Sequence, residues 1–420
     1  MQPIKLTIAG EYWDSQIYQG ILYLFTRDGA IKTVNWDPLV DGLSTGQSLR
    51  LAASCAFQRS DYLYNSNFQM IFSDADVKNV IQKKFVALHD CKLHIDQKTL
   101  AKKFERKSQD TPFPFPHADS LMYGRSMYVV GQSGLWQADC NKRNVYPVSR
   151  KPGRIWDAPV LAVSGNYGSL ALSAGREGLW EVDLGWSEYR QPKKAKNISK
   201  RPCIDCEWLY YSIFASSYDD SGYLASFSNE LEHVKKNSED DDDIDDLHSS
   251  VGQGPRKRIF EGEIDSSQIF KKLGHYSWGV KDKVYSGGNK KISVSSYNPW
   301  DKYGNAIQQV GTYELEHAGS IVSAGVASFG VVIEYDDAIV VLPSKGKAVM
   351  LRGEPVNWRV FPKSLHYQNH LHVIYGDHIA IYSFNHDYFV DQKNKIYGSR
   401  PETNELYRPR IPQTRQNIQL

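Results

Sequence analysis

The sequence has few cysteines, few methionines and no long apolar run. Its 420 residues include 5 Cys and 5 Met. Cysteines that are few, odd in number and irregularly spaced are typical of reduced thiols in the cytosol, not of a disulfide framework. The chain contains no run of about 18 apolar residues that would predict a membrane span. Its first residues also lack the apolar core of a signal peptide. These absences predict a cytoplasmic protein with no membrane segment.

The common catalytic and cofactor motifs are also missing. The sequence has no GxSxG element, no Walker-type loop and no glycine-rich dinucleotide fingerprint. The His89-Asp90-Cys91-Lys92-Leu93-His94 run and the Cys203-Ile204-Asp205-Cys206 run each offer only part of a zinc site, which needs four ligands. We therefore expect no catalytic residue, no bound metal and no cofactor. A formal net charge of +2 argues against a protein devoted to nucleic acid or anionic membranes.

Aromatic residues are abundant and favour β structure. The chain has 26 Tyr, 16 Phe and 10 Trp, which suit half-buried pleated surfaces. A repeat becomes visible when Ser133-Gly134-Leu135-Trp136 is compared with Glu177-Gly178-Leu179-Trp180, 44 residues later. A weaker copy, Ser221-Gly222-Tyr223-Leu224, follows after another 44 residues. Each copy comes after an apolar segment, so the repeated unit is predicted to be a strand, a tight turn and a second strand.

The same unit recurs along the chain. Seven such turns are predicted, at or near Gly29, Gly134, Gly178, Gly222, Gly288, Asp337 and Asp377. A Trp often stands upstream of the turn and is predicted to mark the innermost strand of the unit: Trp13, Trp156, Trp208, Trp278 and Trp358. A period of about 40–45 residues with several short strands is what a propeller blade requires.

In this respect the chain resembles the β-propeller superfamily in the broad sense. The resemblance is architectural, because the Gly-His and Trp-Asp pairs of WD repeats are absent in register, and it carries no functional residue across. It implies an all-β fold, a propeller of about seven blades with a mainly helical insertion and a disordered acidic loop. Two separate β domains flanking the insertion are the alternative. The segment from Ile4 to Ile8 is expected to close the ring by completing the last blade, a purely structural role.

The domain organisation follows from the interruptions of the repeat. We expect a first blade over 1–42, a helical insertion over 43–110, the remaining blades over 111–390 and an extended Pro/Arg tail over 391–420. Within the blades, residues 235–258 carry a block of acidic residues followed by a basic one, and such charge blocks are expected to be disordered. The insertion either docks a partner or covers one face of the propeller, since long connections in compact folds are usually functional.

Three functions are compatible with these features. The first is a non-catalytic scaffold that binds proteins in a complex, because Tyr, Trp and Arg are enriched at interface hot spots. The second is a nucleic-acid-associated subunit whose contacts come from a basic helix, a loop and the tail: Lys98, Lys102, Lys103, Arg106, Lys193, Lys194, Arg400, Arg408 and Arg410. The third is a hydrolase or lyase that uses carboxylates at the mouth of the channel, drawn from Asp14, Asp157, Asp205 and Glu207. The first is the prediction carried forward.

Overall fold

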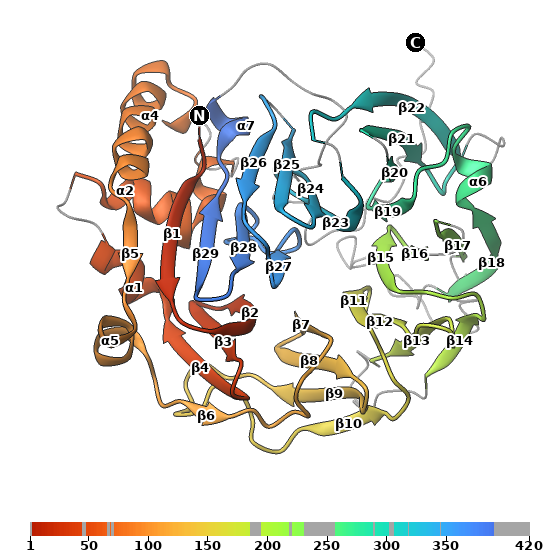
Figure 1. The fold of residues 1–420 in the computed structure, drawn as a ribbon, viewed down its shortest axis with the longest axis horizontal. Coiled ribbons are helices and arrows are strands. Elements are labelled where there is room, and N and C mark those ends of the chain that lie inside the picture. Colours follow the sequence, from red (N-terminus) through yellow and green to blue (C-terminus); the bar gives the residue numbers. More distant parts are fainter. Residues whose placement is uncertain are drawn as a thin grey trace, which may run out of the picture.

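The strands form seven sheets arranged around a central axis (Figure 1). The computed structural model describes residues 2–43, 48–64, 68, 71–184, 195–217, 221–230, 257–288, 290–301, 306–317, 319–344 and 346–389. Six of the sheets have four strands and one has five. Each sheet is one blade whose innermost strand faces the axis, so the protein is a seven-bladed β-propeller, as the repeat predicts.

The blades are numbered in chain order, with strands given from the axis outward. Blade 1 has β2 (Tyr12–Tyr18), β3 (Ile21–Thr26), β4 (Ala30–Asn35) and β6 (Gln109–Asp110). Blade 2 has β7 (Asp119–Tyr123), β8 (Ser126–Gly131), β9 (Gly134–Asp139) and β10 (Gly153–Trp156). Blade 3 has β11 (Ala162–Asn166), β12 (Ser169–Ser173), β13 (Leu179–Asp183) and β14 (Lys196–Ser199). Blade 4 has β15 (Asp205–Leu209), β16 (Ser212–Ser216), β17 (Tyr223–Glu230) and β18 (Lys257–Asp265).

Blade 5 has β19 (Tyr276–Val280), β20 (Lys283–Gly288), β21 (Lys291–Tyr297) and β22 (Ile307–Glu314). Blade 6 has β23 (Ile321–Ala327), β24 (Gly330–Tyr335), β25 (Ala338–Pro343) and β26 (Val349–Arg352). Blade 7 has β27 (Asn357–Val360), β28 (His370–Ile374), β29 (His378–Ser383), β1 (Ile4–Ala9) and β5 (Leu93–Ile95). All seven predicted turns fall between the second and third strands of their blades, one in each blade.

The repeated glycines are required by the close approach of neighbouring backbone. Gly134 and Gly178 have φ of +101° and +88°, values that favour glycine. A Cβ on Gly134 would lie 2.0 Å from the backbone oxygen of Trp156, and one on Gly178 would lie 2.1 Å from that of Ser199. Both oxygens belong to the outermost strand of the same blade. The Gly-Leu-Trp motif is therefore explained by the packing of the fourth strand against the turn.

The N-terminal strand closes the ring. β1 pairs antiparallel with β29, from Ile4 opposite Ser383 to Ala9 opposite His378. Its apolar side chains at Ile4, Leu6 and Ile8 are at most 1% exposed. Blade 7 thus joins the two ends of the described chain, which confirms the closing role predicted for this segment.

A mainly helical insertion lies between β4 and β6, both of blade 1, and packs beside blade 7 (Figure 1). Its elements, apart from β5, are α1 (Trp36–Leu43), α2 (Arg50–Ala53), η1 (Ser54–Gln58), η2 (Ser60–Leu63), α4 (Ala75–Asp90), α5 (Gln97–Thr99) and η3 (Leu100–Phe104). Two further short helices are α6 (Ser266–Ile269) and α7 (His386–Phe389). The insertion shares one apolar core with β1 and β29, which includes Phe57, Phe85 and Ile381. In the described part of the chain, no helix has the length and apolar character needed to cross a membrane.

The Trp markers identify the innermost strand in four blades but not in a fifth. Trp13, Trp208, Trp278 and Trp358 lie on β2, β15, β19 and β27, all next to the axis. Trp156 instead lies on β10, the outermost strand of blade 2, so its predicted position was wrong. Its ring lies 4.9 Å from that of Trp180 in blade 3. A Trp next to a strand end therefore packs between blades at the rim as well as at the axis, and local sequence does not separate the two cases.

Candidate functional site

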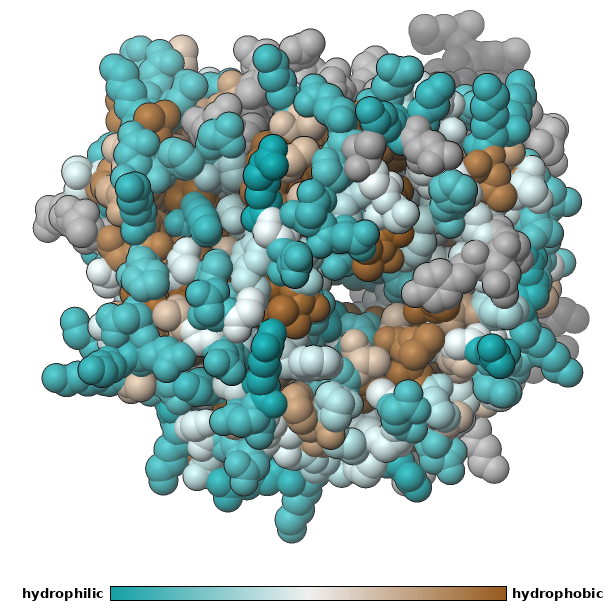
Figure 2. Space-filling model, viewed as in Figure 1, coloured by the Kyte–Doolittle hydropathy of each residue, from teal (hydrophilic) through white to brown (hydrophobic). Residues whose placement is uncertain are grey.

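Polar side chains recur where the innermost strands begin. In four blades an Asp or Asn side-chain oxygen accepts a hydrogen bond from the N–H of the next residue: Asp14 from Ser15 at 2.7 Å, and Asp119, Asp205 and Asn357 from Ser120, Cys206 and Trp358 at 2.8 Å each. This local bond fixes each side chain near the backbone of its own strand. Because the innermost strands converge on the axis, four such groups face a shared central region, where Figure 2 shows an opening through the molecule.

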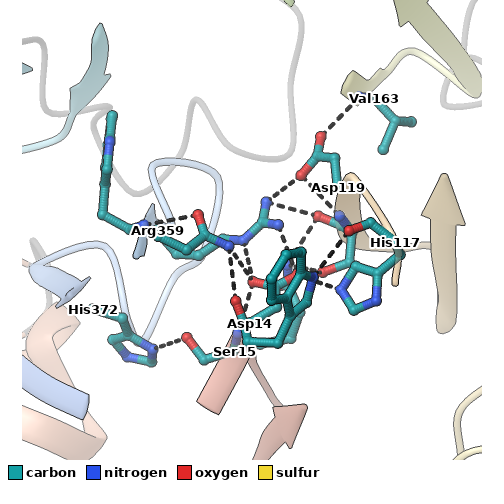
Figure 3. Close-up of polar contacts among 12 residues, drawn as sticks. Asp14, Ser15, His117, Asp119, Val163, Arg359 and His372 are labelled. Atoms are coloured by element: carbon teal, nitrogen blue, oxygen red, sulfur yellow. Dashed lines mark hydrogen bonds and ion pairs between the residues drawn. The ribbon is translucent and has the colours of Figure 1, made fainter. Parts of the chain in front are cut away.

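Arg359 on β27 joins three of the blades at this point (Figure 3). Its Nε donates to Asp14 Oδ1 and its Nη2 to Asp14 Oδ2, both at 2.7 Å. Its Nη1 donates to Asp119 Oδ1 at 2.5 Å and to the Ser120 carbonyl at 3.0 Å. The guanidinium thus makes a two-point contact with blade 1 and reaches blade 2 at the same time, a geometry that lysine does not offer.

Asp14 is buried with a full set of donors. Its side chain is 0% exposed. Besides Arg359, its oxygens accept from Ser120 Oγ at 2.6 Å, from His117 Nε2 at 3.2 Å and from Asn357 Nδ2 at 3.3 Å. Burial by itself would raise the pKa of Asp14, but the charge of Arg359 and the contact with His117 outweigh it and hold the pKa well below its usual range. Asp14 is therefore a structural anion that is ionised at neutral pH.

Asp119 extends the same network to the next blade. Its Oδ2 accepts the backbone N–H of Val163, on β11 of blade 3, at 2.8 Å. Blades 7, 1, 2 and 3 are thus connected through Arg359, Asp14 and Asp119. On the other side of Asp14, His372 Nδ1 lies 3.0 Å from Ser15 Oγ. Burial, together with the neighbouring His370, holds the pKa of His372 well below its usual range, so this ring is neutral.

A second bridge spans the channel through Lys363. This residue lies in the loop between β27 and β28, and its Nζ donates to the Gly165 carbonyl of blade 3 at 2.9 Å and to Glu207 Oε1 of blade 4 at 3.0 Å. Glu207 Oε1 also accepts from Ser164 Oγ at 2.7 Å. The insertion also binds this loop, since Ser60 N and Oγ donate to the His366 carbonyl at 3.1 and 2.7 Å. Blade 7 therefore has ionic contacts with blades on both sides of the axis.

Asp205 differs from the other channel carboxyls. Burial raises its pKa to about 7, and the nearby charges of Asp119 and Glu207 act in the same direction. Its side chain accepts the N–H of Cys206. It therefore gains and loses a proton near neutrality, whereas Asp14 is ionised.

The four carboxylates predicted to line one channel mouth do not form a common site. Asp14 lies on β2, and Asp205 and Glu207 lie on β15. Asp157 is exposed and follows β10 at the outer edge of blade 2, so its predicted place at the channel was wrong. The error follows from Trp156, which was assigned to an innermost strand. Asp14 and Glu207 are each bound to a cation, and paired acid–base chemistry needs two available carboxyls.

The predicted basic contacts are partly described. Lys98 on α5 and Lys102 and Lys103 on η3 are exposed. The Arg106 guanidinium is instead bonded within the protein, to Asn35 Oδ1 and to the Lys142 carbonyl, both at 2.6 Å. The remaining predicted residues lie outside the described part of the chain: Lys193, Lys194, Arg400, Arg408 and Arg410. The described residues contain no group of three or more His, Cys, Asp or Glu side chains arranged to hold a metal ion.

Sequence reasoning missed two features of these sites. Arg359 follows Trp358 directly, but nothing local shows that it reaches a residue 345 positions away. The loop from Asn141 to Arg154 has five basic residues and no acidic one, a signal that was present but not used. The loop contacts Arg106 and Lys107, which follow the helical segment that carries Lys98, Lys102 and Lys103.

Comparison with known proteins yields structural neighbours only. No protein-family model matches the chain, and no curated protein matches it significantly. Among solved structures, the WD40 domain of Neurospora crassa Pan2 is 8% identical, with a TM-score of 0.45 and 90% of each chain covered. A chain of a mitotic checkpoint complex structure is 10% identical, with a TM-score of 0.38, and the match covers 62% of this chain and 74% of that one. At these values neither neighbour informs on function, and the propeller assignment stands on the strand pairing.

Proposed function

We propose that this protein is a non-catalytic propeller scaffold that binds another protein through its helical insertion. The observation that carries this proposal is the position of the exposed apolar side chains. Of 14 large hydrophobic residues exposed in the described chain, five lie between residues 51 and 86 of the insertion: Leu51, Phe68, Ile71, Val80 and Val86, which are 37–55% exposed. Exposed apolar side chains gathered in one part of a fold mark interaction sites more often than isolated ones do.

The insertion is also anchored well enough to present such a surface. The α4 helix begins at an Asp74 N-cap, whose side chain accepts from the N–H groups of Asp76 and Val77. Its inner face buries Ile81, Phe85 and Leu88 in the core shared with the propeller. The outward residues are therefore held in a fixed orientation, which lowers the entropic cost of binding a partner.

The channel supports a structural role for its carboxylates. Asp14 is bound by Arg359 and three further side chains, and Glu207 by Lys363. Freeing Asp14 from its contacts for catalysis would leave a buried charge without its partner, which costs several kcal/mol. This favours the scaffold over the carboxylate-dependent hydrolase or lyase.

Affinity purification from the native host, followed by mass spectrometry, tests the proposal. The wild-type protein is compared with an Ile71→Glu/Val86→Glu variant and with a control, Val310→Glu. Val310 is 45% exposed on the outermost strand of blade 5, so the control adds a charge at a similarly exposed apolar residue outside the insertion. We expect one protein at fixed stoichiometry with the wild type and the control, and its loss with the double variant at an unchanged melting temperature.

Two results would count against the proposal. One is a wild-type protein that is recovered alone and monomeric at physiological salt. The other is a partner retained by the double variant and lost from the Val310 control, because binding would then depend on blade 5 and not on the insertion.

A further inference from the structure

Two basic segments come together on the outer rim of blades 1 and 2. The first, residues 98–107, closes the insertion, and the second, residues 141–154, follows β9 and runs into the start of β10. We call their ten cationic side chains the basic rim: Lys98, Lys102, Lys103, Arg106, Lys107, Lys142, Arg143, Arg150, Lys151 and Arg154. All except the half-buried Arg106 are exposed. In Figure 2 hydrophilic side chains cover the lower left edge, where Figure 1 places α5 and β6.

Arg106 connects the two segments. Its Nη1 donates to the carbonyls of Lys142 and Asn144, at 2.6 and 3.4 Å. Its backbone N–H donates to the Thr33 carbonyl of β4 at 2.7 Å. The position of the basic rim is therefore set by the propeller itself and not by the free movement of two loops.

An aromatic ring lies within the basic rim. The Arg150 guanidinium carbon is 3.8 Å from the centre of the Tyr146 ring, and Lys107 Nζ is 6.0 Å from the same centre. One lysine from the first segment and one arginine from the second thus share this ring. A further arginine, Arg154, lies over the Trp136 ring at 5.9 Å.

The charge within the two segments is almost entirely of one sign. The two segments contain ten basic residues and a single acidic one, Glu105. The basic rim forms no ion pair with a carboxylate among the residues that the structure describes. The whole chain carries a formal charge of only +2, so the basic rim is a strong local excess. Such an excess raises the local concentration of polyanions.

We propose that the basic rim binds the phosphate backbone of single-stranded nucleic acid. A surface with ten cations and one carboxylate fits a polymer with one negative charge per repeat. An acidic protein surface, by contrast, also carries cations and amide donors. These groups need carboxylates as partners, and the two segments of the basic rim contain only Glu105. Aromatic rings interleaved with basic residues are typical of single-strand binding, because bases stack on rings and arginine planes. This proposal does not depend on the scaffold function.

Fluorescence anisotropy with a labelled 20-nucleotide oligouridylate tests the proposal across a salt series. If the basic rim contacts about six phosphates, the slope of log K against log salt is about −4, because each contact with a single strand contributes roughly −0.7. The affinity should then fall about 250-fold between 50 and 200 mM salt. A Lys102→Gln/Lys103→Gln/Arg150→Gln/Lys151→Gln variant should flatten the slope by about 3.

A matched control removes the same charge elsewhere. The control replaces four exposed lysines at blade 5 with Gln: Lys271, Lys272, Lys290 and Lys291. This change should leave the slope of log K against log salt unchanged. Melting temperatures of both variants are measured first, and both are expected to match the wild type.

Several outcomes would overturn the proposal. Absence of binding at 50 mM salt would do so, and so would an equal loss of affinity in the control variant. Equally tight binding of a 20-residue polyglutamate would assign the basic rim to an acidic protein partner instead. Equally tight binding of a 20-base-pair duplex would remove the preference for single strands.

Discussion

Replacement of Arg359 by methionine is expected to destabilise the fold strongly. The change keeps much of the aliphatic volume but removes the cation that contacts Asp14 at two points and Asp119 at a third. Asp14 is 0% exposed, so its carboxylate would stay buried after losing the arginine that pairs with it. Removing one partner of a buried ion pair costs about 3–5 kcal/mol.

For a chain of this length, a loss of about 4 kcal/mol lowers the melting temperature by about 5 °C.

The pH dependence of this loss has a definite sign. Because the pKa of Asp14 is depressed in the folded wild type, its pairing contributes stability above the ordinary carboxyl pKa, and this is lost as the pH falls. In the Arg359→Met variant burial raises the pKa of Asp14 instead. The difference in melting temperature between the variant and the wild type should therefore be largest near pH 7 and become smaller towards pH 4.

Scanning calorimetry at pH 4, 5.5 and 7 measures this, with Lys363→Met as the matched control. The pair of Lys363 with Glu207 is also in the channel, but its side chains are 43% and 36% exposed. Exposed pairs contribute about 0–1 kcal/mol, so the control should lose at most about 1 °C. A variant at Arg359 that melts within 1 °C of the wild type, or a control that loses as much, would refute the role of Arg359 as the cation that stabilises buried Asp14.

Three further changes have expected outcomes. Gly178→Ala should lower the free energy of unfolding in urea by about 3 kcal/mol, because its Cβ would lie 2.1 Å from the Ser199 oxygen. The control Gly153→Ala, whose Cβ would have no atom within 4 Å, should lower it by less than about 1 kcal/mol. Asp205→Asn should stabilise the protein by about 2 kcal/mol at pH 8 and little at pH 4. A folded pKa near 7 means that wild-type stability falls as the pH rises from about 4 to 7; equal melting shifts at both pH values would contradict this. Leu6→Ala should cost about 3 kcal/mol by unfolding, because this 0% exposed residue anchors the closing strand; a near-neutral result would show that β1 is dispensable.

The turns of the blades could be predicted from sequence because their chemistry is local. The conformations of Gly134 and Gly178 and the alternation around them are specified within a few residues. Seven such signals were enough to count the blades. The order of strands within a blade was less accessible, as Trp156 illustrates, because both inner and outer strands place large aromatic rings against a neighbouring blade.

The channel network could not be predicted in the same way. Arg359 reaches Asp14 and Asp119 across 345 and 240 residues of sequence, and Lys363 reaches Glu207 across 156. Such pairs are created by the ring closing on itself, so no window of the sequence contains both partners. Asp14 was singled out for its place beside a Trp, but a carboxylate that is a candidate base and one that is a structural anion have the same local sequence. Only the position of the cation distinguishes them.

The place of the insertion follows from the same closure. Blade 7 is built from both ends of the described chain, because β1 pairs with β29. The covalent chain that connects these two strands runs around the whole ring. Closing such a ring depends on non-covalent contacts at one seam, between β29 and β1. The insertion packs its core against this seam and holds the loop that carries Lys363, through Ser60 and Asp61. It therefore adds buried apolar area at the seam on which closure of the ring depends.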